Sequence, residues 1–200
     1  MAKIIYKEGC EGQNKLSCIE GIEIDLLNGQ QALIFPKYSK EPLLRGEQID
    51  KWNARALSEI EALKVEDNIS DTAALVILDS PAANWVFKFS TKDGRNFWLP
   101  SLLAAMEIQH QEEEIDALAE TIEGADLLRD FTSGVWSCSR TFLNGVWLVI
   151  GGYIYAGSSG SNGNGLGAAC LAVPTILYRE EGINADDCTL ATVKIKWEEE

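Results

Sequence analysis

The chain has 200 residues and a formal net charge of −14 at pH 7, with 46% hydrophobic and 24% charged residues. This balance is typical of a globular domain with a sizeable core. The acidic excess and the lack of a basic stripe argue against nucleic acid as a partner, because phosphate binding needs clustered Lys and Arg. No apolar run is long enough for a transmembrane segment or a secretory signal. We therefore expect a protein made in the cytoplasm, whose final place could be a virion or a cell surface.

Short strands are predicted for the first 45 residues. Ile22, Ile24 and Leu26 alternate along one strand, and the pair Asn28-Gly29 that follows is typical of a hairpin turn. Residues 32–35 would form the returning strand.

The middle of the chain alternates between helical and extended patterns. Apolar residues at three- and four-residue spacing predict one helix over residues 47–64, on a face formed by Ile49, Trp52, Ala56, Ile60 and Leu63. A polar loop is expected at 66–72. The short apolar runs at 73–78 and 85–89 are predicted to be strands.

A second helical region begins at Ser101, which is a good N-cap residue. Its apolar side carries Leu102, Leu103 and Met106, and His110 follows as a packed or surface residue. The helical pattern continues to a stop at Gly124 and fits one helix or two. The acidic run at residues 112–114 is expected to be a solvated face.

The composition changes abruptly after residue 132. Residues 133–176 hold one charged residue, Arg140, and nine of the chain's 17 glycines. A third strand of this region is expected at 168–173, before Pro174. Charge then returns in an acidic tail over residues 177–200, in which residues 190–197 alternate like a final strand.

A β-hairpin is strongly predicted around Gly151-Gly152, because two glycines supply the positive φ angles of a type I′ turn. A two-residue turn fixes the register of the strands. One face of the hairpin would then carry Leu148, Ile150, Tyr153 and Tyr155. The opposite face would carry Trp147, Val149, Ile154 and Ala156.

Both faces of this hairpin are apolar, whereas an antiparallel sheet usually has a polar outer face. Two interpretations remain open at this point. The sheet could be sandwiched inside the domain. Alternatively, the tyrosine-bearing face could be a binding surface, flanked by the Ser-, Gly- and Asn-rich loop at residues 158–167, since that composition is typical of recognition surfaces.

The cysteines do not form a recognisable site. Their number, five, is odd, and none forms a C-x-x-C pair, so a reduced compartment with structural thiols is expected. The single histidine is far in sequence from every cysteine, and the loop at 158–167 has no carboxylate for calcium. No metal and no cofactor are expected.

Four segments together resemble bacterial C-type-lectin-like domains. They are NFWLPS at residues 96–101, IDAL at 115–118, VWSCSR at 135–140 and VWLV at 146–149. They follow the family's order and spacing over residues 94–176. Cys138 stands where the family usually has serine, and the closing strand motif after Pro174 is missing.

This resemblance implies an α+β fold of the C-type-lectin type, with two or more helices packed on small twisted antiparallel sheets. Residues 1–93 would belong to the same domain with an insertion near 66–93, residues 94–176 would form the lectin-like core, and 177–200 the acidic strand or tail. Family members include adhesins and fimbrial proteins of gut bacteria. Others are the variable proteins of diversity-generating retroelements, often carried by phages, in which a reverse transcriptase randomises outward positions of this segment.

The function that we expect is therefore binding of a protein or glycan ligand on a cell surface, without catalysis. The candidate ligand-binding residues are Arg140, Thr141, Phe142, Leu143, Asn144, Leu148, Ile150, Tyr153, Tyr155, Ser158, Ser159, Ser161, Asn162, Asn164 and Leu166. Of these, Arg140 fits a ligand contact and a structural hydrogen-bond donor equally well.

Two other functions compete with this expectation. A structural or adhesin subunit of a pilus or virion would pack the apolar face permanently against another subunit. An enzyme related to the formylglycine-generating oxidases would need Cys138 and Cys170 to converge near a base or a cation. The sequence leaves the oligomeric state open.

Overall fold

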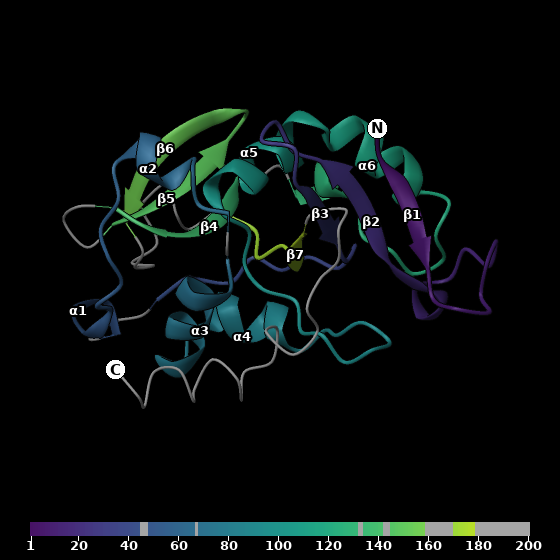
Figure 1. Ribbon diagram of the computed structural model, residues 1–200, viewed down its shortest axis with the longest axis horizontal. Helices are drawn as coiled ribbons and strands as arrows, with labels where there is room; N and C mark the ends of the chain where they lie inside the picture. Colours follow the sequence, from purple (N-terminus) through teal and green to yellow (C-terminus); the bar gives the residue numbers. More distant parts are fainter. Residues whose placement is uncertain (45–47, 67, 132–133, 142–144, 159–169, 179–200) are drawn as a thin grey trace.

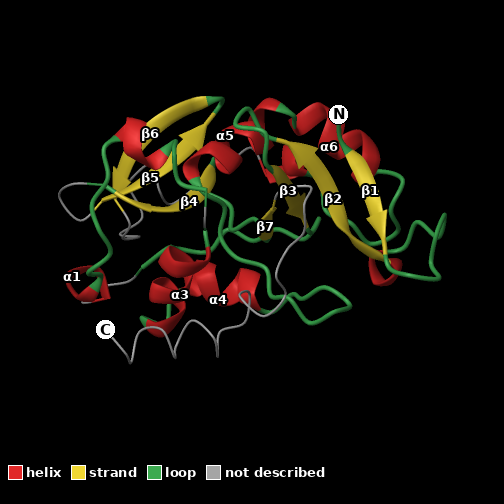
Figure 2. Ribbon diagram, in the orientation of Figure 1, coloured by secondary structure: helices red, strands yellow, loops and turns green. Residues whose placement is uncertain are grey.

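The structure is a computed structural model that describes residues 1–44, 48–66, 68–131, 134–141, 145–158 and 170–178. It is an α+β fold, as expected, in which helices pack against two small antiparallel sheets (Figures 1 and 2). The two sheets stand at opposite ends of the view, with helix α5 between them.

The first sheet joins strands from the two ends of the described chain. Its strands, in spatial order, are β1 (Lys3–Tyr6), β2 (Ile19–Asp25), β3 (Gln31–Ile34) and β7 (Thr175–Tyr178), all antiparallel. The 3₁₀ turn η1 (Leu16–Cys18) precedes β2. The hairpin predicted at Asn28-Gly29 is confirmed, since Gly29 has a φ of 82° and the amide of Leu26 donates to the carbonyl of Gln30.

The second sheet contains the predicted glycine hairpin. Its strands are β4 (Val135–Arg140), β5 (Gly145–Ile150) and β6 (Tyr153–Ser158). The predicted register is confirmed, because Ile150 pairs with Tyr153 and Leu148 with Tyr155. The turn residues Gly151 and Gly152 have φ angles of 58° and 78°, which L residues with a side chain adopt only at a cost.

Two helices follow one another between the sheets. Helix α5 (Leu102–His110) begins at the predicted N-cap Ser101, whose hydroxyl accepts from the amide of Ala104 at 3.3 Å. Helix α6 (Glu112–Ala119) starts after a break at Gln111, so the helical pattern is two helices. Helix α5 packs against β4 and β5, and α6 packs against β2.

A buried carboxylate attaches the turn that follows α6. Asp116 is 2% exposed and accepts from the amides of Leu128 and Arg129 at 2.7 and 3.0 Å. These bonds hold the 3₁₀ helix η2 (Leu128–Phe131) against α6. The aspartate therefore satisfies backbone donors that burial would otherwise leave unpaired.

The single helix predicted over 47–64 is wrong. The structure has two single-turn helices, α1 (Gln48–Lys51) and α2 (Glu59–Ala62), with an extended link between them. Tertiary hydrogen bonds replace helical ones in that link, because the amide of Leu57 donates to the carbonyl of Arg140 and Arg140 Nη1 donates to the carbonyl of Ala54. A capping box of Ser58 and Glu61 then starts α2.

The strands predicted at 73–78 and 85–89 are also wrong, because most of these residues are helical. Residues 73–77 lie in α3 (Ile69–Ile77) and 85–87 in α4 (Pro81–Phe87). Ser80 caps α4, because its hydroxyl accepts from the amide of Ala83. Pro81 occupies the first helical position, where a backbone N–H would have no partner within the helix, so its missing N–H costs nothing. Alanine pairs in both segments favour helix, and this preference outweighs the short apolar runs.

The second sheet has a core cluster on each face. On one side Val135 and Val149 join a cluster with α5, α6 and the first sheet. On the other side Trp136 and Leu148 join a cluster with Trp52, α3 and α4. Figure 1 shows α3 and α4 below this sheet.

Some expectations fall at the edge of the described chain. For the strand expected at 168–173, the described part makes isolated bridges, from Leu171 to Val135 and from Ala172 to Ser39, and the regular strand follows Pro174 as β7. The strand expected at 190–197 lies outside the described residues. Among those that are described, no helix has the length and apolar character needed to cross a membrane.

Candidate functional site

The face of the hairpin that was predicted to point outward is covered along β5. Leu148 is fully buried, and Ile150 is half-buried against the cluster that contains Trp52 and Trp136. The prediction that Leu148 lies on an open surface is therefore wrong. Its physical reason is that α3, α4 and the segment before them, which the sequence did not place, cover this side of the sheet.

The same face is open along β6. Tyr153 is 71% exposed and Tyr155 is 37% exposed, although their partners on β5 are covered. Strand β6 is at the edge of its sheet, with β5 as its one partner strand among the described residues. We call these two side chains the tyrosine edge.

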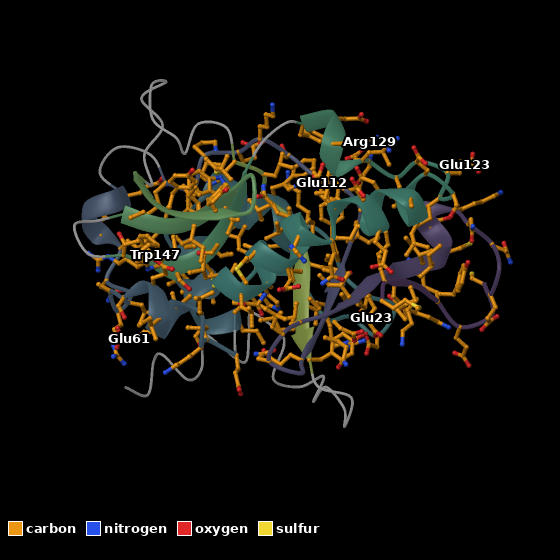
Figure 3. The ribbon with its side chains drawn as sticks, turned by 90° about the horizontal axis from the view of Figure 1, so that it is seen from above. Glu23, Glu61, Glu112, Glu123, Arg129 and Trp147 are labelled. Atoms are coloured by element: carbon orange, nitrogen blue, oxygen red, sulfur yellow. The ribbon has the colours of Figure 1, made fainter. Side chains whose placement is uncertain are left out.

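The core face of the hairpin anchors the tyrosine edge from behind. Val149 is fully buried, while Trp147 and Ile154 pack against the cluster under α5. Trp147, labelled in Figure 3, donates from Nε1 to the carbonyl of Leu57 at 2.9 Å. The tyrosines thus project from a strand whose inner side is fixed by packing and a hydrogen bond.

Arg140 and Thr141 take part in the structure around the hairpin. The Arg140 guanidinium donates to the carbonyl of Ala54 at 2.8 Å and lies 5.9 Å from the ring centroid of Trp52. Thr141 is 4% exposed, and its amide donates to the carbonyl of Gly145. Of the two roles left open for Arg140, the structure shows the hydrogen-bond donor. The expectation that Thr141 is an accessible contact is wrong, because it is buried.

All but one of the remaining candidate residues lie outside the part of the chain that the structure describes. Those outside the described residues are Phe142, Leu143, Asn144, Ser159, Ser161, Asn162, Asn164 and Leu166. Ser158 ends β6, and its backbone pairs with Gly145. The tyrosine edge and half-buried Ile150 are therefore what the structure retains of the predicted binding face.

A pocket that the sequence did not predict lies beside the hairpin turn. It has a volume of about 190 Å³. Its lining residues are Leu27, Met106, Glu107, His110 and Gly152. The amide of Gly152 donates to Gln109 Oε1 at 3.0 Å, which fastens the turn to α5. The three- and four-residue spacing of Met106, Glu107 and His110 was visible in the sequence, but the docking of the turn was not.

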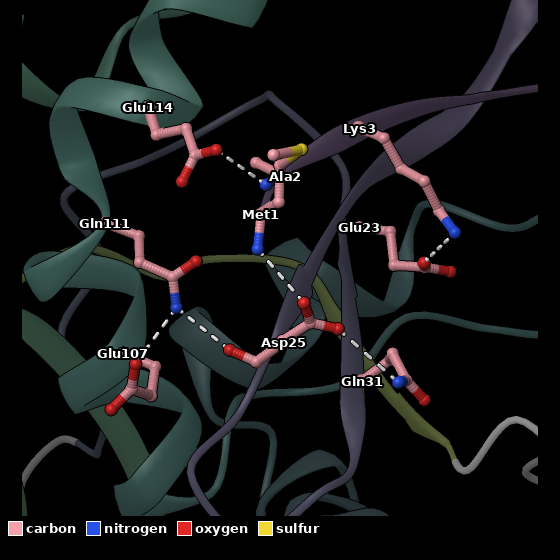
Figure 4. Close-up of polar contacts among 9 residues, drawn as sticks. All are labelled: Met1, Ala2, Lys3, Glu23, Asp25, Gln31, Glu107, Gln111 and Glu114. Atoms are coloured by element: carbon pink, nitrogen blue, oxygen red, sulfur yellow. Dashed lines mark hydrogen bonds and ion pairs between the residues drawn. The ribbon is translucent and has the colours of Figure 1, made fainter.

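Glu107 is the buried acid of this pocket. It is 5% exposed, and its Oε2 accepts from Gln111 Nε2 at 2.9 Å. The same amide nitrogen donates to the carbonyl of Asp25 (Figure 4). The Asp25 carboxylate is engaged elsewhere, because the Met1 ammonium bonds it at 3.0 Å and lowers its pKa.

The two cysteines of the enzyme hypothesis belong to one core cluster. Cys138 and Cys170 are 0% and 1% exposed. Burial raises the pKa of Cys170 to about 12, so its thiol stays protonated at neutral pH. Within the part of the chain that the structure describes, no group of three or more potential metal-ligating side chains is found.

Comparison with known proteins gave no relatives: no family model, no curated protein and no solved structure matches this chain.

Proposed function

We propose that this chain is a non-catalytic binding protein that recognises a protein or glycan on a cell surface through the tyrosine edge. The observation that carries this proposal is the exposure of Tyr153 and Tyr155 on a strand that is otherwise anchored in the core. Tyrosine offers a large, rigid, amphipathic contact area with little loss of conformational entropy, which is why recognition surfaces are rich in it. A rigid support beneath such side chains lowers the entropic cost of binding.

The order of the elements supports a C-type-lectin-like scaffold for this surface. The chain forms strands β1 to β3 of a sheet that β7 closes, then a series of helices that ends with the consecutive pair α5 and α6, then a second sheet with the hairpin. The motif at 96–101 supplies the buried Trp98 and the N-cap Ser101, and the motif at 135–140 forms β4. Opening a helix is the role that the resemblance implies for the motif at 96–101.

Within this scaffold, the proposal extends to a variable protein of a diversity-generating retroelement. The buried Leu148 would be a fixed position, whereas Tyr153 and Tyr155 would be diversified positions. The flanking DNA tests this point directly. We expect a near-copy of the codons for residues 135–176, differing mainly at adenines, beside a reverse transcriptase gene; a locus with neither would remove this extension.

Binding itself can be tested with a glycan array and with intact bacterial cells as probes. We expect binding that the double variant Tyr153→Ala/Tyr155→Ala loses. The matched control is Ile77→Ala, since Ile77 is 50% exposed on α3 and lies outside the tyrosine edge. Equal binding by the double variant and the control would contradict the proposal.

A second candidate function is that of a subunit of a pilus or virion, which the edge position of β6 favours. An apolar strand at a sheet edge can pair with a strand of another molecule. Size-exclusion chromatography with light scattering separates the two functions. A permanent subunit should yield no folded monomer, whereas a recognition protein can exist as one.

The enzyme alternative has a chemical test as well. Alkylation with iodoacetamide at neutral pH should modify the half-buried Cys10 and Cys18 before Cys138 and Cys170. Rapid modification of Cys170 in the folded protein would show a reactive thiolate there and would revive this alternative.

A further inference from the structure

The pocket beside the hairpin turn is formed by three separate parts of the chain. Leu27 comes from the turn between β2 and β3, Gly152 from the turn between β5 and β6, and the other lining residues from α5. A hydrogen bond of 3.0 Å from the amide of Gly152 to Gln109 Oε1 attaches the hairpin turn to α5. The pocket is therefore a built feature where two turns meet a helix.

Glu107 is the one acidic residue among those that line the pocket. Glu107 is 5% exposed, and none of the ion pairs among the described residues includes it. One amide donor, Gln111 Nε2, bonds one of its two carboxylate oxygens. A buried carboxylate is destabilised unless a cation or several donors compensate it. The pocket wall thus favours a positively charged guest.

The size and the other walls of the pocket define that guest further. Ligand pockets for whole cofactors or drug-sized molecules have volumes of about 300–1,000 Å³. At about 190 Å³ this pocket fits a single side chain or a short aliphatic chain. Met106 and Leu27 supply apolar surface for such a chain, and the 78% exposure of Leu27 marks an open entrance.

We infer that this pocket binds a primary alkylammonium group, with the cation at Glu107 and its methylene chain against Met106 and Leu27. The group could belong to a free amine or to a lysine of a bound protein. The net charge of −14 attracts either of them. As a lysine subsite the inference rests on the proposed function, because Gly152 joins the pocket to the strand that carries Tyr153.

The chain contains convenient reporters for a direct test. It has two methionines, of which Met106 lines the pocket and Met1 lies elsewhere, and its single histidine, His110, also lines the pocket. The protein is labelled at the methionine methyl carbons and titrated with n-butylammonium chloride. We expect a saturable shift of the Met106 methyl and His110 ring signals. Neutral n-butanol and sodium chloride at equal concentration should give no saturable shift.

Two variants assign the binding to the carboxylate. Glu107→Gln should weaken n-butylammonium binding by at least about tenfold, since the amide oxygen can still accept a hydrogen bond but the negative charge that strengthens it is lost. Glu113→Gln removes the same charge from an exposed position nearby on α6 and should bind like the parent. Equal shifts with butanol and butylammonium, or equal affinity in the two variants, would overturn the inference. The comparison of butylammonium with butanol decides the matter alone if Glu107→Gln does not fold.

A second probe separates the two sources of the ammonium group. Nα-acetyl-lysine methylamide should bind at least as well as butylammonium if the pocket receives a lysine, whereas a free-amine site would prefer butylammonium. Ile77→Ala, which changes neither the pocket nor the tyrosine edge, should leave both titrations unchanged. If the proposed function fails, the tyrosine variants will bind the target as well as the parent does. If this inference fails, the Met106 signal will not shift with n-butylammonium.

Discussion

Two of the edge strands, β1 and β6, differ in the side chains that they carry. Strand β1 is one edge of the first sheet and carries charge, since Lys3 pairs with Glu23 at 2.6 Å (Figure 4). Strand β6 is one edge of the second sheet and has no charged residue in its sequence YIYAGS. Both strands have an anchored neighbour, so the difference lies in what each presents to the solvent.

Charge on an edge strand discourages other strands from pairing with it. The first sheet therefore has a protected edge, whereas the second has an edge with exposed aromatic rings and no charge. The contrast teaches that the second sheet combines a buried strand, β5, with an uncharged and aromatic edge strand, β6, which is the strand that the proposed function uses.

The largest loss of unfolding free energy is expected at Leu148 on β5. Leu148→Ala removes a fully buried side chain and should lower the free energy of unfolding by about 2–5 kcal/mol, because it leaves a cavity in the core cluster that contains Trp52 and Trp136. Tyr153→Ala, at the start of the neighbouring strand β6, should change it by less than about 0.5 kcal/mol. Urea unfolding followed by tryptophan fluorescence measures both. Similar losses in the two variants would break the division between β5 and β6.

A pair of glycines compares the packing of the two sheets. A Cβ atom on Gly21 would lie 2.6 Å from the carbonyl oxygen of Ile34, and one on Gly134 would meet both the carbonyl of Val149 and the side chain of Ile150 more closely still. We expect each alanine variant to lose about 1–3 kcal/mol through overpacking. The Gly134 variant should lose more. Thermal unfolding by circular dichroism would show the order, and the reverse order would mean that the first sheet is the more tightly packed.

Helix α4, which packs over the second sheet, should depend on its N-cap residue Ser80. Ser80→Ala removes the acceptor for the amide of Ala83 and a buried hydroxyl that also donates to the carbonyl of Leu43. The expected loss of unfolding free energy is about 1–2 kcal/mol. Ser58→Ala, at the exposed cap of α2, is the matched control and should lose less. Chemical denaturation of both variants tests whether α4 helps to hold the face that carries Leu148.

The smallest effect is expected at the charged edge. Lys3→Ala removes a pair in which the lysine side chain is 64% exposed, so the loss should be about 0.2–1 kcal/mol and should shrink as salt is added. Denaturation at low and high ionic strength measures it. A loss that does not depend on salt would show that Lys3 stabilises β1 by packing instead of by charge.

Short-range signals predicted the parts of the fold that local chemistry controls. Two consecutive glycines fix a two-residue turn, so the full pairing from Trp147 to Ala156 could be read from the sequence. The N-cap at Ser101 and the hairpin at Gly29 were predictable for the same reason. Each of these features is decided by residues that lie within a few positions of one another.

Features decided by distant contacts were not predictable. Arg140 reaches back to the carbonyl of Ala54, and this contact interrupts a segment whose periodicity indicated one helix. The prediction that Leu148 faces outward was wrong because the alternation of side chains along a strand does not show which helices cover each face of the sheet. The pocket at Glu107 was missed because it needs the meeting of three segments.

The pairing of β3 with β7 brings the two ends of the long segment between them together. Residues 31–34 and 175–178 are hydrogen-bonded neighbours, so the long excursion that carries the hairpin leaves from and returns to one place. Because both ends of this excursion are fixed in one sheet, we expect that the hairpin can be exchanged for another without moving the points at which the excursion is attached. Under the proposed function, such an exchange would give the same scaffold a new specificity.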